Sequence, residues 1–336
     1  MQLCEEKFAY LSFTDFFYNV RSMILPELYL ITQEVPKADI YHATATGYSG
    51  ILGSLGKWKY NKPFILTEHG IYTREREEEL LRAQWVLPYF KNQWINLFHL
   101  FSDCAYSHAD VVTALFSRAN EAQMELGCDE NKLRVTPNGV HIERFADVPD
   151  KPEDGWTDIG AIVRIARIKD IKTMIYAFAE VKREIGNVRL HIMGDIDDGE
   201  YYEACRTLIE QLGVQDIIFT GSVDVAEYIK KLDFIILTSI SEGQPLSVLE
   251  AFAAGRACVT TDVGCCRELI EGNDGLGEAG ICVPPMNKEQ VAQAMLELCR
   301  EPFTRKRMGA VGRERVRKYY THDLSLIHIS EPTRRS

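Results

Sequence analysis

The stretch FIILTSISEGQPLSVLEAFAAGRACVTTDVG, residues 234–264, decides the fold. It opens with four apolar residues, 234–237, that predict a buried strand, and residues 246–254 have the apolar spacing of a helix. A Gly-Gln-Pro turn separates the two, and residues 257–264 predict a further strand. A strand, a helix and a second strand in so short a span predict one unit of a parallel α/β sheet.

The same alternation extends outward from this unit in both directions. Strand-like segments separated by helical ones are ADIYHAT, KPFILTEHG, ADVVTAL and KLRVTPNGV in the first half and IGAIVRI, VRLHIMG and IIFTG in the second. Strands that alternate with helices of this length predict two parallel sheets with helices on both faces. Ligands of such sheets bind at the carboxyl edges of the strands, so we expect a cleft between the two domains.

The domain boundaries follow from composition. Residues 148–157 are rich in Pro, Asp and Gly and predict a linker between an N-terminal Rossmann-like domain, 1–147, and a C-terminal one, 158–323. The start of the chain has no strand followed by a Gly-rich turn, so we expect the first domain to be incomplete. Residues 324–336 break the preceding basic helical pattern and resemble a translated sequencing adapter, so we expect a non-native tail and truncation at both ends.

Composition excludes several classes of protein. With 46% apolar and 26% charged residues the chain is ordinary for a globular protein, and a net charge of −11 disfavours a nucleic-acid partner. Nine cysteines without C-x-x-C spacing indicate free thiols in a reducing compartment. The acidic start does not resemble a signal peptide, and no apolar run approaches about 18 residues, so we expect a cytoplasmic protein.

Two glutamates, Glu242 and Glu250, lie at the turn and on the helix of the opening stretch. Pro245 is predicted as the first helical residue, which leaves the amides of Leu246 and Ser247 as free donors for an anion or a sugar hydroxyl. Ionised carboxylates only accept hydrogen bonds and suit vicinal hydroxyls such as a ribose diol. We expect both glutamates to face one ligand. For Glu250 the alternative is a cap or a surface ion pair.

Cations follow the first strand of the second domain in IVRIARIKD, residues 162–170. Arg164 and Lys169, five residues apart across a turn, are placed to converge on a diphosphate. The alternative is a solvated basic loop. Ribose, sugar and diphosphate together indicate a nucleotide sugar. Because these cations can neutralise the phosphates, we expect no metal at the D-x-D of residues 195–197 and no other cofactor.

The motifs EGQPLSVLE, VRIARIK, PNGV, IMGD, FTGSV and TDVGCCRELI resemble the retaining GT-B glycosyltransferases of family four over residues 36–300. The string LTEHGIYTREREEEL is similar to the PelF subgroup, which serves Pel exopolysaccharide synthesis in biofilms. The resemblance implies two doubly wound domains facing a cleft. It also implies that a hexose is transferred from a UDP-sugar to a growing polysaccharide, with UDP-glucose as the expected donor. Membrane-bound Pel synthesis and export proteins would be partners, holding the enzyme at the inner membrane periphery.

The resemblance assigns a role to each matching residue. The catalytic pair would be Glu242, which binds donor-sugar hydroxyls near the anomeric carbon, and His69, which faces the sugar. Glu250 would bind the ribose, and Arg164 and Lys169 would clamp the diphosphate. The segment Gly221–Val223 would lie near the nucleotide base. The residues expected to bind the donor are then Arg164, Lys169, Gly243, Leu246, Ser247, Glu250, Gly221, Ser222 and Val223.

Two other functions keep the same fold. A non-catalytic nucleotide-sugar-binding subunit would share the binding residues, so the sequence leaves it open. A GT-B nucleotide-sugar epimerase is expected to lack the paired glutamates, and a NAD-dependent dehydrogenase should carry G-x-G-x-x-G, which is absent.

Two further patterns predict packing rather than chemistry. The glycines Gly47, Gly50, Gly53 and Gly56 predict a helix face that its neighbours approach closely, or an edge of the cleft, rather than a dinucleotide fingerprint. Another helical stripe predicts a core face, although a membrane- or partner-facing helix is conceivable; it comprises Val86, Phe90, Trp94, Leu97 and Phe101.

Overall fold

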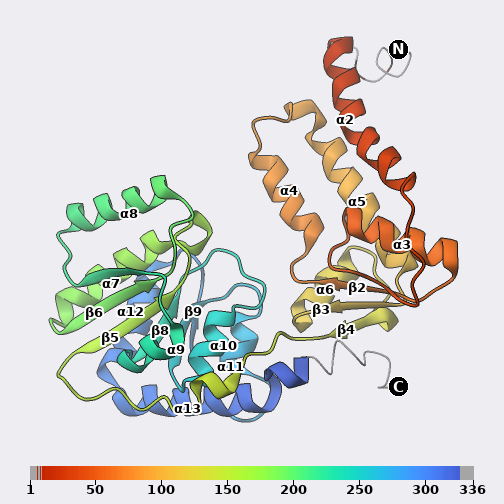
Figure 1. The fold of residues 1–336 in the computed structure, drawn as a ribbon. Coiled ribbons are helices and arrows are strands. Elements are labelled where there is room, and N and C mark those ends of the chain that lie inside the picture. Colours follow the sequence, from red (N-terminus) through yellow and green to blue (C-terminus); the bar gives the residue numbers. More distant parts are fainter. Residues whose placement is uncertain (1–5, 7, 9, 326–336) are drawn as a thin grey trace. The chain divides into compact units, whose positions relative to one another are not determined.

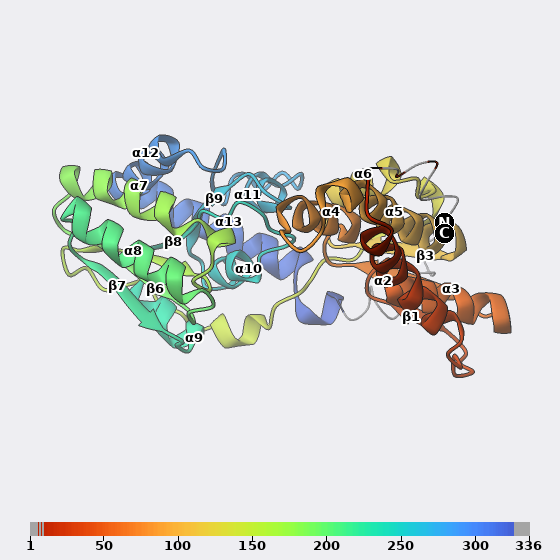
Figure 2. The same ribbon diagram turned by 90° about the horizontal axis from the view of Figure 1, so that it is seen from above.

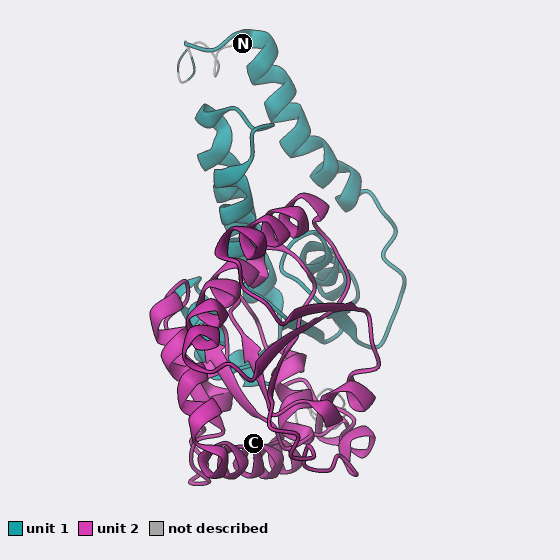
Figure 3. Cartoon of the chain, turned by 90° about the vertical axis from the view of Figure 1, so that its left-hand side faces the viewer, with its two compact units in different colours: residues 1–136 teal, residues 137–336 magenta. Residues whose placement is uncertain are grey.

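The structure is a computed structural model that describes residues 6, 8 and 10–325 of the chain. It divides into two compact units, residues 1–136 and residues 137–336 (Figure 3). Each unit contains one parallel β-sheet with helices packed on it (Figure 1). The expected α/β class with two parallel sheets, the Rossmann-like domains of a GT-B fold, is confirmed.

The first unit has a four-stranded sheet in the order β1-β2-β3-β4. Its strands are β1 (Tyr41–Ala43), β2 (Phe64–Glu68), β3 (Val111–Ala114) and β4 (Leu133–Val135). Its helices are α2 (Phe13–Ile31), α3 (Tyr48–Tyr60), α4 (Tyr72–Arg82), α5 (Lys91–His108) and α6 (Ser117–Glu125). Within the described residues the strand order of this sheet follows the chain without a reversal.

Glycines allow α3 to lie close to the sheet beneath it. A Cβ at Gly53 would lie 2.3 Å from the ring of Phe64, and one at Gly56 would lie 2.7 Å from the ring of Tyr41. A larger residue at either position would displace a buried ring of β1 or β2. The predicted close-approach helix face is therefore confirmed.

The aromatic stripe over residues 86–101 belongs to the core. Phe90 and Trp94 are 1% and 8% exposed, and they share a hydrophobic cluster with Val86, Phe101 and the partly buried Leu97. The core interpretation is confirmed, but the single helix expected for it is wrong. A 3-10 turn over Pro88–Phe90 precedes α5, because the residue before a proline avoids helical backbone and proline lacks an amide donor.

The second unit has a six-stranded sheet in the order β10-β9-β8-β5-β6-β7. Its strands are β5 (Thr157–Ile162), β6 (Val188–Met193), β7 (Ile217–Gly221), β8 (Phe234–Leu237), β9 (Ala257–Thr261) and β10 (Gly280–Val283). Its helices are α7 (Ile171–Glu184), α8 (Gly199–Leu212), α9 (Val225–Tyr228), α10 (Leu246–Ala253), α11 (Cys266–Glu271), α12 (Lys288–Arg300) and α13 (Pro302–Tyr319).

The strand order of this sheet reverses between β5 and β8, so the sheet is doubly wound. Helix α7 lies beside both α8 and α12 (Figure 2), whereas α10 packs against α13. In such sheets the crevice at the carboxyl ends of the strands on either side of the reversal binds the ligand. The fold therefore predicts a ligand site at the loops that follow β5 and β8.

The segment predicted as the linker, 148–157, packs within the second unit, and the two units divide at residues 136 and 137. Lys151 Nζ lies 2.6 Å from Asp158 Oδ2, and Arg256 Nη2 donates to the carbonyl of Pro149 at 2.7 Å. Asp158 is 2% exposed, and a buried carboxylate requires cationic partners, which hold the chain that precedes β5.

Most of the predicted non-native tail lies outside the described residues. Of the tail predicted over 324–336, residues 326–336 are outside the described residues, and Ser325 N bonds back to the carbonyl of Thr321 at 3.1 Å. Among the helices of the described residues, none combines the length and the apolar character that crossing a membrane requires.

Candidate functional site

The loops after β5 and β8 lie together at the carboxyl edge of the second sheet. The amide of Ile240 donates to the carbonyl of Ile168 at 2.8 Å. The hydroxyl of Thr238 donates to the carbonyls of Lys169 at 3.0 Å and Asp170 at 3.1 Å. These contacts place the predicted cationic loop against the turn that carries Glu242.

Lys169 and Glu242 form a short ion pair at this edge. Lys169 Nζ lies 2.5 Å from Glu242 Oε1, and the hydroxyl of Ser239 donates to the same oxygen at 2.5 Å. The side chains of Lys169 and Glu242 are only 18% and 11% exposed, so water screens the pair weakly. Nothing in the described part of the chain hydrogen-bonds Glu242 Oε2, which leaves this oxygen available to a ligand hydroxyl.

The turn after Glu242 ends at helix α10, which begins at Leu246. Pro245 has extended backbone (φ −72°, ψ 111°) and occupies the N-cap, so its predicted place inside the first helical turn is wrong by one residue. The cause is that the Pro245 carbonyl already accepts from the amide of Val248 at 3.1 Å, which is the role of a cap residue. The amides of Leu246 and Ser247 make no hydrogen bond within residues 10–325, as expected of the first helical donors. They form the positive end of the helix dipole.

Gly264 supports this turn from behind, a role that sequence reasoning did not assign. Its φ of +54° favours glycine, and a Cβ there would lie 2.2 Å from the carbonyl oxygen of Gly243 and 2.3 Å from that of Glu242. The next residue, Cys265, donates its amide to the Gly243 carbonyl at 3.0 Å. The Val-Gly pair that ends TTDVG was the available signal, because a glycine after a strand often marks close backbone approach.

Gln244 is a second residue that sequence reasoning missed. It is 8% exposed, and its side-chain carbonyl accepts from the amide of Asn138 at 2.6 Å. This bond joins the turn after Glu242 to the PNGV segment at residues 137–140, so the turn is held from three directions.

Arg164 and the predicted base loop line one cavity of about 270 Å³. Arg164 follows β5, and Ser222 and Val223 follow β7, where Gly221 has a φ of +68°. Gly194, after β6, also lines the cavity, and its missing Cβ leaves room for the carbonyl of Val163. The structure thus brings together predicted residues from two loops that are more than 50 residues apart in sequence.

Each cation of the predicted diphosphate clamp has its own carboxylate. Arg164 pairs with Asp197 of the D-x-D segment, whereas Lys169 pairs with Glu242. The side chain of Arg164 is 67% exposed, so it can turn toward a ligand in the cavity at little cost. Within the described residues no three His, Cys, Asp or Glu side chains gather as a metal site.

Glu250 lies on α10, in the second turn after the free amides. Burial raises the pKa of its carboxyl group, and the nearby charge of Arg144 lowers it only in part. The side chain of Glu250 makes no hydrogen bond or ion pair among residues 10–325, unlike the cap or surface ion pair that was the alternative. A half-buried carboxylate without a partner has acceptor capacity to spare for hydroxyl groups.

His69 is exposed in the first unit, directly after β2. The residue before it, Glu68, is 2% exposed and accepts hydrogen bonds from Tyr106 at 2.7 Å and Gln123 at 2.9 Å. Burial raises the pKa of Glu68, although these hydrogen bonds oppose the rise. Glu68 therefore anchors the end of β2 that carries His69, a role for which TEHG was the only sequence signal.

Two family models match parts of this chain. Residues 157–301 match the family described as "Glycosyl transferases group 1", and residues 1–131 match "Domain of unknown function (DUF3492)". The second match gives the first unit no function.

Curated relatives are glycosyltransferases of diverse sugars. The MMP alpha-(1->4)-mannosyltransferase of Mycolicibacterium hassiacum is 25% identical over 76% of this chain and 61% of its own. The alpha-monoglucosyldiacylglycerol synthase of Streptococcus pneumoniae is 27% identical over 79% and 64%. The chain thus spans less than two thirds of the length of these relatives.

Solved structures share the fold. HepE of Anabaena in complex with UDP and glucose has a TM-score of 0.70 at 17% identity, covering 89% of this chain and 78% of its own. The sucrose-phosphate synthase of Thermosynechococcus elongatus has a TM-score of 0.72 at 19% identity, covering 94% and 77%.

Proposed function

We propose that this chain, whose residues 157–301 match the group 1 glycosyl transferases, is a retaining glycosyltransferase that moves a hexose from a UDP-sugar to an exopolysaccharide. The observation that carries the proposal is the Lys169–Glu242 pair beside the free amides of α10. One turn thus contains a cation, a carboxylate that can accept hydrogen bonds from hydroxyl groups, and a helix end that can bind an anion. A sugar diphosphate needs all three.

The donor in this proposal is UDP-glucose. Glu250 would accept hydrogen bonds from the ribose hydroxyls, and the cavity between Arg164 and Val223 would receive the diphosphate and base. HepE, which shares the fold, has been solved with UDP-glucose, and this supports the choice of donor. We propose that binding needs no metal, because cations and helix amides already surround the position assigned to the phosphates.

The chemical step follows from where charge develops. The bond between the anomeric carbon and the phosphate oxygen breaks, and negative charge grows on the nucleoside diphosphate. Lys169, Arg164 and the amides of Leu246 and Ser247 would stabilise that charge, and fixed donors of this kind are usually the largest catalytic contribution. Glu242 would hold sugar hydroxyls through Oε2, and His69 of the first unit would face the sugar. So good a leaving group requires no general acid.

The acceptor and partners rest on the TEHGIYTRERE string and its likeness to the PelF subgroup. We propose a growing Pel-like polysaccharide as acceptor and membrane-bound synthesis and export proteins as partners. The compartment would be the cytoplasm, where the buried thiols of Cys205, Cys258 and Cys266 stay reduced.

Two measurements test the proposal. Calorimetry with UDP-, GDP- and ADP-glucose should show the tightest binding for the UDP-sugar, and tighter binding of either other donor would contradict it. Release of UDP from UDP-glucose should then rise when a polysaccharide acceptor extract is added. Tight UDP binding without any release, with or without acceptor, would instead identify a non-catalytic nucleotide-sugar-binding subunit.

A further inference from the structure

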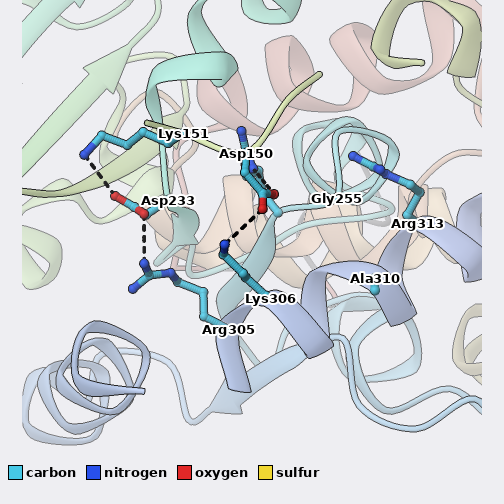
Figure 4. A pocket seen from close by; sticks show the side chains of 9 residues that line it. Asp150, Lys151, Asp233, Gly255, Arg305, Lys306, Ala310 and Arg313 are labelled. Carbon is cyan, nitrogen blue, oxygen red and sulfur yellow. Dashed lines mark hydrogen bonds and ion pairs between the residues drawn. The ribbon is translucent and has the colours of Figure 1, made fainter. Parts of the chain in front are cut away.

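A second polar pocket lies at the opposite, amino edge of the second sheet. It has a volume of about 140 Å³ and lies between the segment 149–151, the start of β9 and helix α13 (Figure 4). Five cationic side chains and two aspartates line it, for a formal charge of +3. None of these residues belongs to the proposed donor site.

Three of the cations have carboxylate partners. Lys151 lies 3.4 Å from Asp233, and Arg305 lies 2.8 Å from the other oxygen of the same aspartate. Lys306 pairs with Asp150 at 2.9 Å. These ion pairs (Figure 4) occupy both aspartates of the pocket. Of the other two cations, Arg256 has only a long ion pair of 4.0 Å with Asp150, and Arg313 has no ion pair within the described residues.

Arg256 is the more buried of the two, at 5% exposed. Its guanidinium donates to the carbonyls of Pro149 at 2.7 Å and Ile229 at 3.4 Å. Within the described residues its nearest carboxylate oxygen belongs to Asp150, 4.0 Å from Nη1 and beyond hydrogen-bond distance. Burial lowers the pKa of Arg256. The negative charges of Asp150 and Asp233 oppose this shift only in part, and the positive charge of Arg313 adds to it.

Arg313 extends from α13 toward the same pocket (Figure 4). Its Nη2 donates to the carbonyl of Ala254 at 2.8 Å, while its buried Nε has no hydrogen-bond partner. No carboxylate among residues 10–325 forms an ion pair with it. Gly255 has a φ of +71°, and a Cβ there would lie 2.5 Å from Arg313 Nη2, so a glycine lets the guanidinium lie against the backbone. The arginine is therefore held in place rather than free in solvent.

We propose that this pocket is an anion site that binds a phosphoryl group, as inorganic phosphate or a phosphomonoester, between Arg256 and Arg313. A dianion would neutralise two guanidiniums that now repel each other, and its oxygens would accept hydrogen bonds from both side chains. Arginine forks match phosphate geometry well. The volume is about ten times what one water needs, which suits a small oxyanion with its remaining waters. The bound anion would brace the segment before β5 against α13.

The test uses the full chain saturated with UDP, so that the proposed donor site is already occupied. Inorganic phosphate is titrated by calorimetry at constant ionic strength, and thermal unfolding is followed in parallel. Phosphate should bind and raise the melting temperature in a concentration-dependent manner, as a ligand of the folded state does. Glucose 6-phosphate in a second arm identifies the source: tighter binding than phosphate indicates a phosphomonoester, and equal or weaker binding indicates inorganic phosphate.

Two variants and a matched control make the result specific. Arg313→Met should weaken phosphate binding by about tenfold or more, the usual value of a lost charge-assisted hydrogen bond. Asp150→Asn should strengthen it, because a competing carboxylate is removed. Arg307→Met, an exposed change on the same helix, is the matched control and should bind as the parent does. Equal phosphate affinity in Arg313→Met and Arg307→Met, or an equal thermal shift from chloride, would overturn the proposal.

The outcome is independent of the glycosyltransferase proposal. Lys169→Met should abolish donor binding. Without UDP, this variant should still bind phosphate at the amino-edge pocket as the parent does. A chain that binds phosphate through Arg313 but never turns over UDP-glucose would keep this site and lose only the proposed function.

Discussion

At the scale of single residues, the donor site depends on which carboxylate has a partner. The carboxylate of Glu242 accepts from Lys169 and Ser239 through one oxygen, whereas the carboxylate of Glu250 has no partner within the described residues. The same side-chain type, eight positions apart, therefore has two different electrostatic environments. Lys169 orients Glu242 before any ligand arrives, while Glu250 lacks the hydrogen bonds that a half-buried carboxylate prefers.

This difference separates the effects of the two substitutions. Glu250→Ala should weaken UDP binding by roughly tenfold to a hundredfold, since hydrogen bonds to a charged group are worth about 1.5–3 kcal/mol. Glu242→Ala should leave UDP affinity nearly unchanged and lower kcat instead. Calorimetry and initial rates on the same preparations measure both effects. Equal UDP affinity for Glu250→Ala and the parent would remove the ribose assignment.

The anchor beneath His69 gives a second test at this scale. Glu68→Ala removes the acceptor for Tyr106 and Gln123 and leaves two buried donors unpaired, so it should lower both stability and kcat. Glu68→Gln keeps the shape and one acceptor, and it should restore most of the kcat. If Glu68→Ala changed stability alone, with kcat equal to that of the parent, the link to His69 would fail.

At the scale of elements, the turn between β8 and α10 is held by the loop between β9 and α11. Gly264 lies against the carbonyls of Glu242 and Gly243, and the amide of Cys265 completes the contact. The orientation of the helix amides therefore depends on a segment that itself touches no proposed ligand atom. Position 264 tolerates no side chain for two reasons, a positive φ and the lack of space.

Alanine substitutions at two glycines distinguish the effect of the positive φ from the effect of the lack of space. Gly264→Ala should displace the turn, weaken UDP-sugar binding and lower the melting temperature. Gly275→Ala is the matched control, since Gly275 also has a positive φ, of +73°, but a Cβ there would meet nothing within 4 Å. It should show only the backbone cost of roughly 1 kcal/mol with normal binding. Comparable loss of binding in the two variants would contradict the support role of Gly264.

At the scale of the whole molecule, stability of the second unit depends on a buried charge cluster around Asp158. Its carboxylate accepts from His191 at 2.8 Å and Arg189 at 2.6 Å, and Lys151 lies 2.6 Å away. Burial alone would raise the pKa of Asp158, but these three partners outweigh it and hold the pKa well below 3.8. The cluster ties β5 and β6 to the segment that precedes them.

The depressed pKa sets a pH dependence with a definite sign. A carboxyl group whose pKa is lower in the folded state stabilises the fold above its unfolded value near 3.8 and loses this contribution as the pH falls further. Asp158→Asn should therefore cost about 3 kcal/mol at pH 7 and less at pH 3, as measured by urea unfolding. Asp154→Asn, at the exposed edge of the cluster, should have a smaller effect. An Asp158→Asn penalty as large at pH 3 as at pH 7 would contradict this account.

Much of the architecture follows from the sequence alone. Alternating strands and helices predict two parallel sheets, and the doubly wound order of the second sheet explains why residues after β5, β7 and β8 share one edge. The local signals of turn residues, basic residues and paired glutamates are enough to nominate Arg164, Glu242 and Glu250, whereas residues 221–223 were nominated only by the family resemblance. The prediction of the fold succeeds because backbone periodicity and turn chemistry act over a few neighbouring residues, whereas the roles of the nominated residues stay predictions.

The partners of those residues were decided by the tertiary structure. Lys169 and Glu242 are 73 positions apart, Asn138 and Gln244 are 106 apart, and Glu68 receives its hydrogen bonds from 38 and 55 positions away. No periodicity spans such separations, since only the packing of the sheet sets which loops meet. Arg256 and Arg313 at the amino edge illustrate the same limit. The sequence shows basic residues before β9 and in α13, but only the packed structure shows that Arg256 is buried with one long ion pair and that Arg313 has none within the described residues.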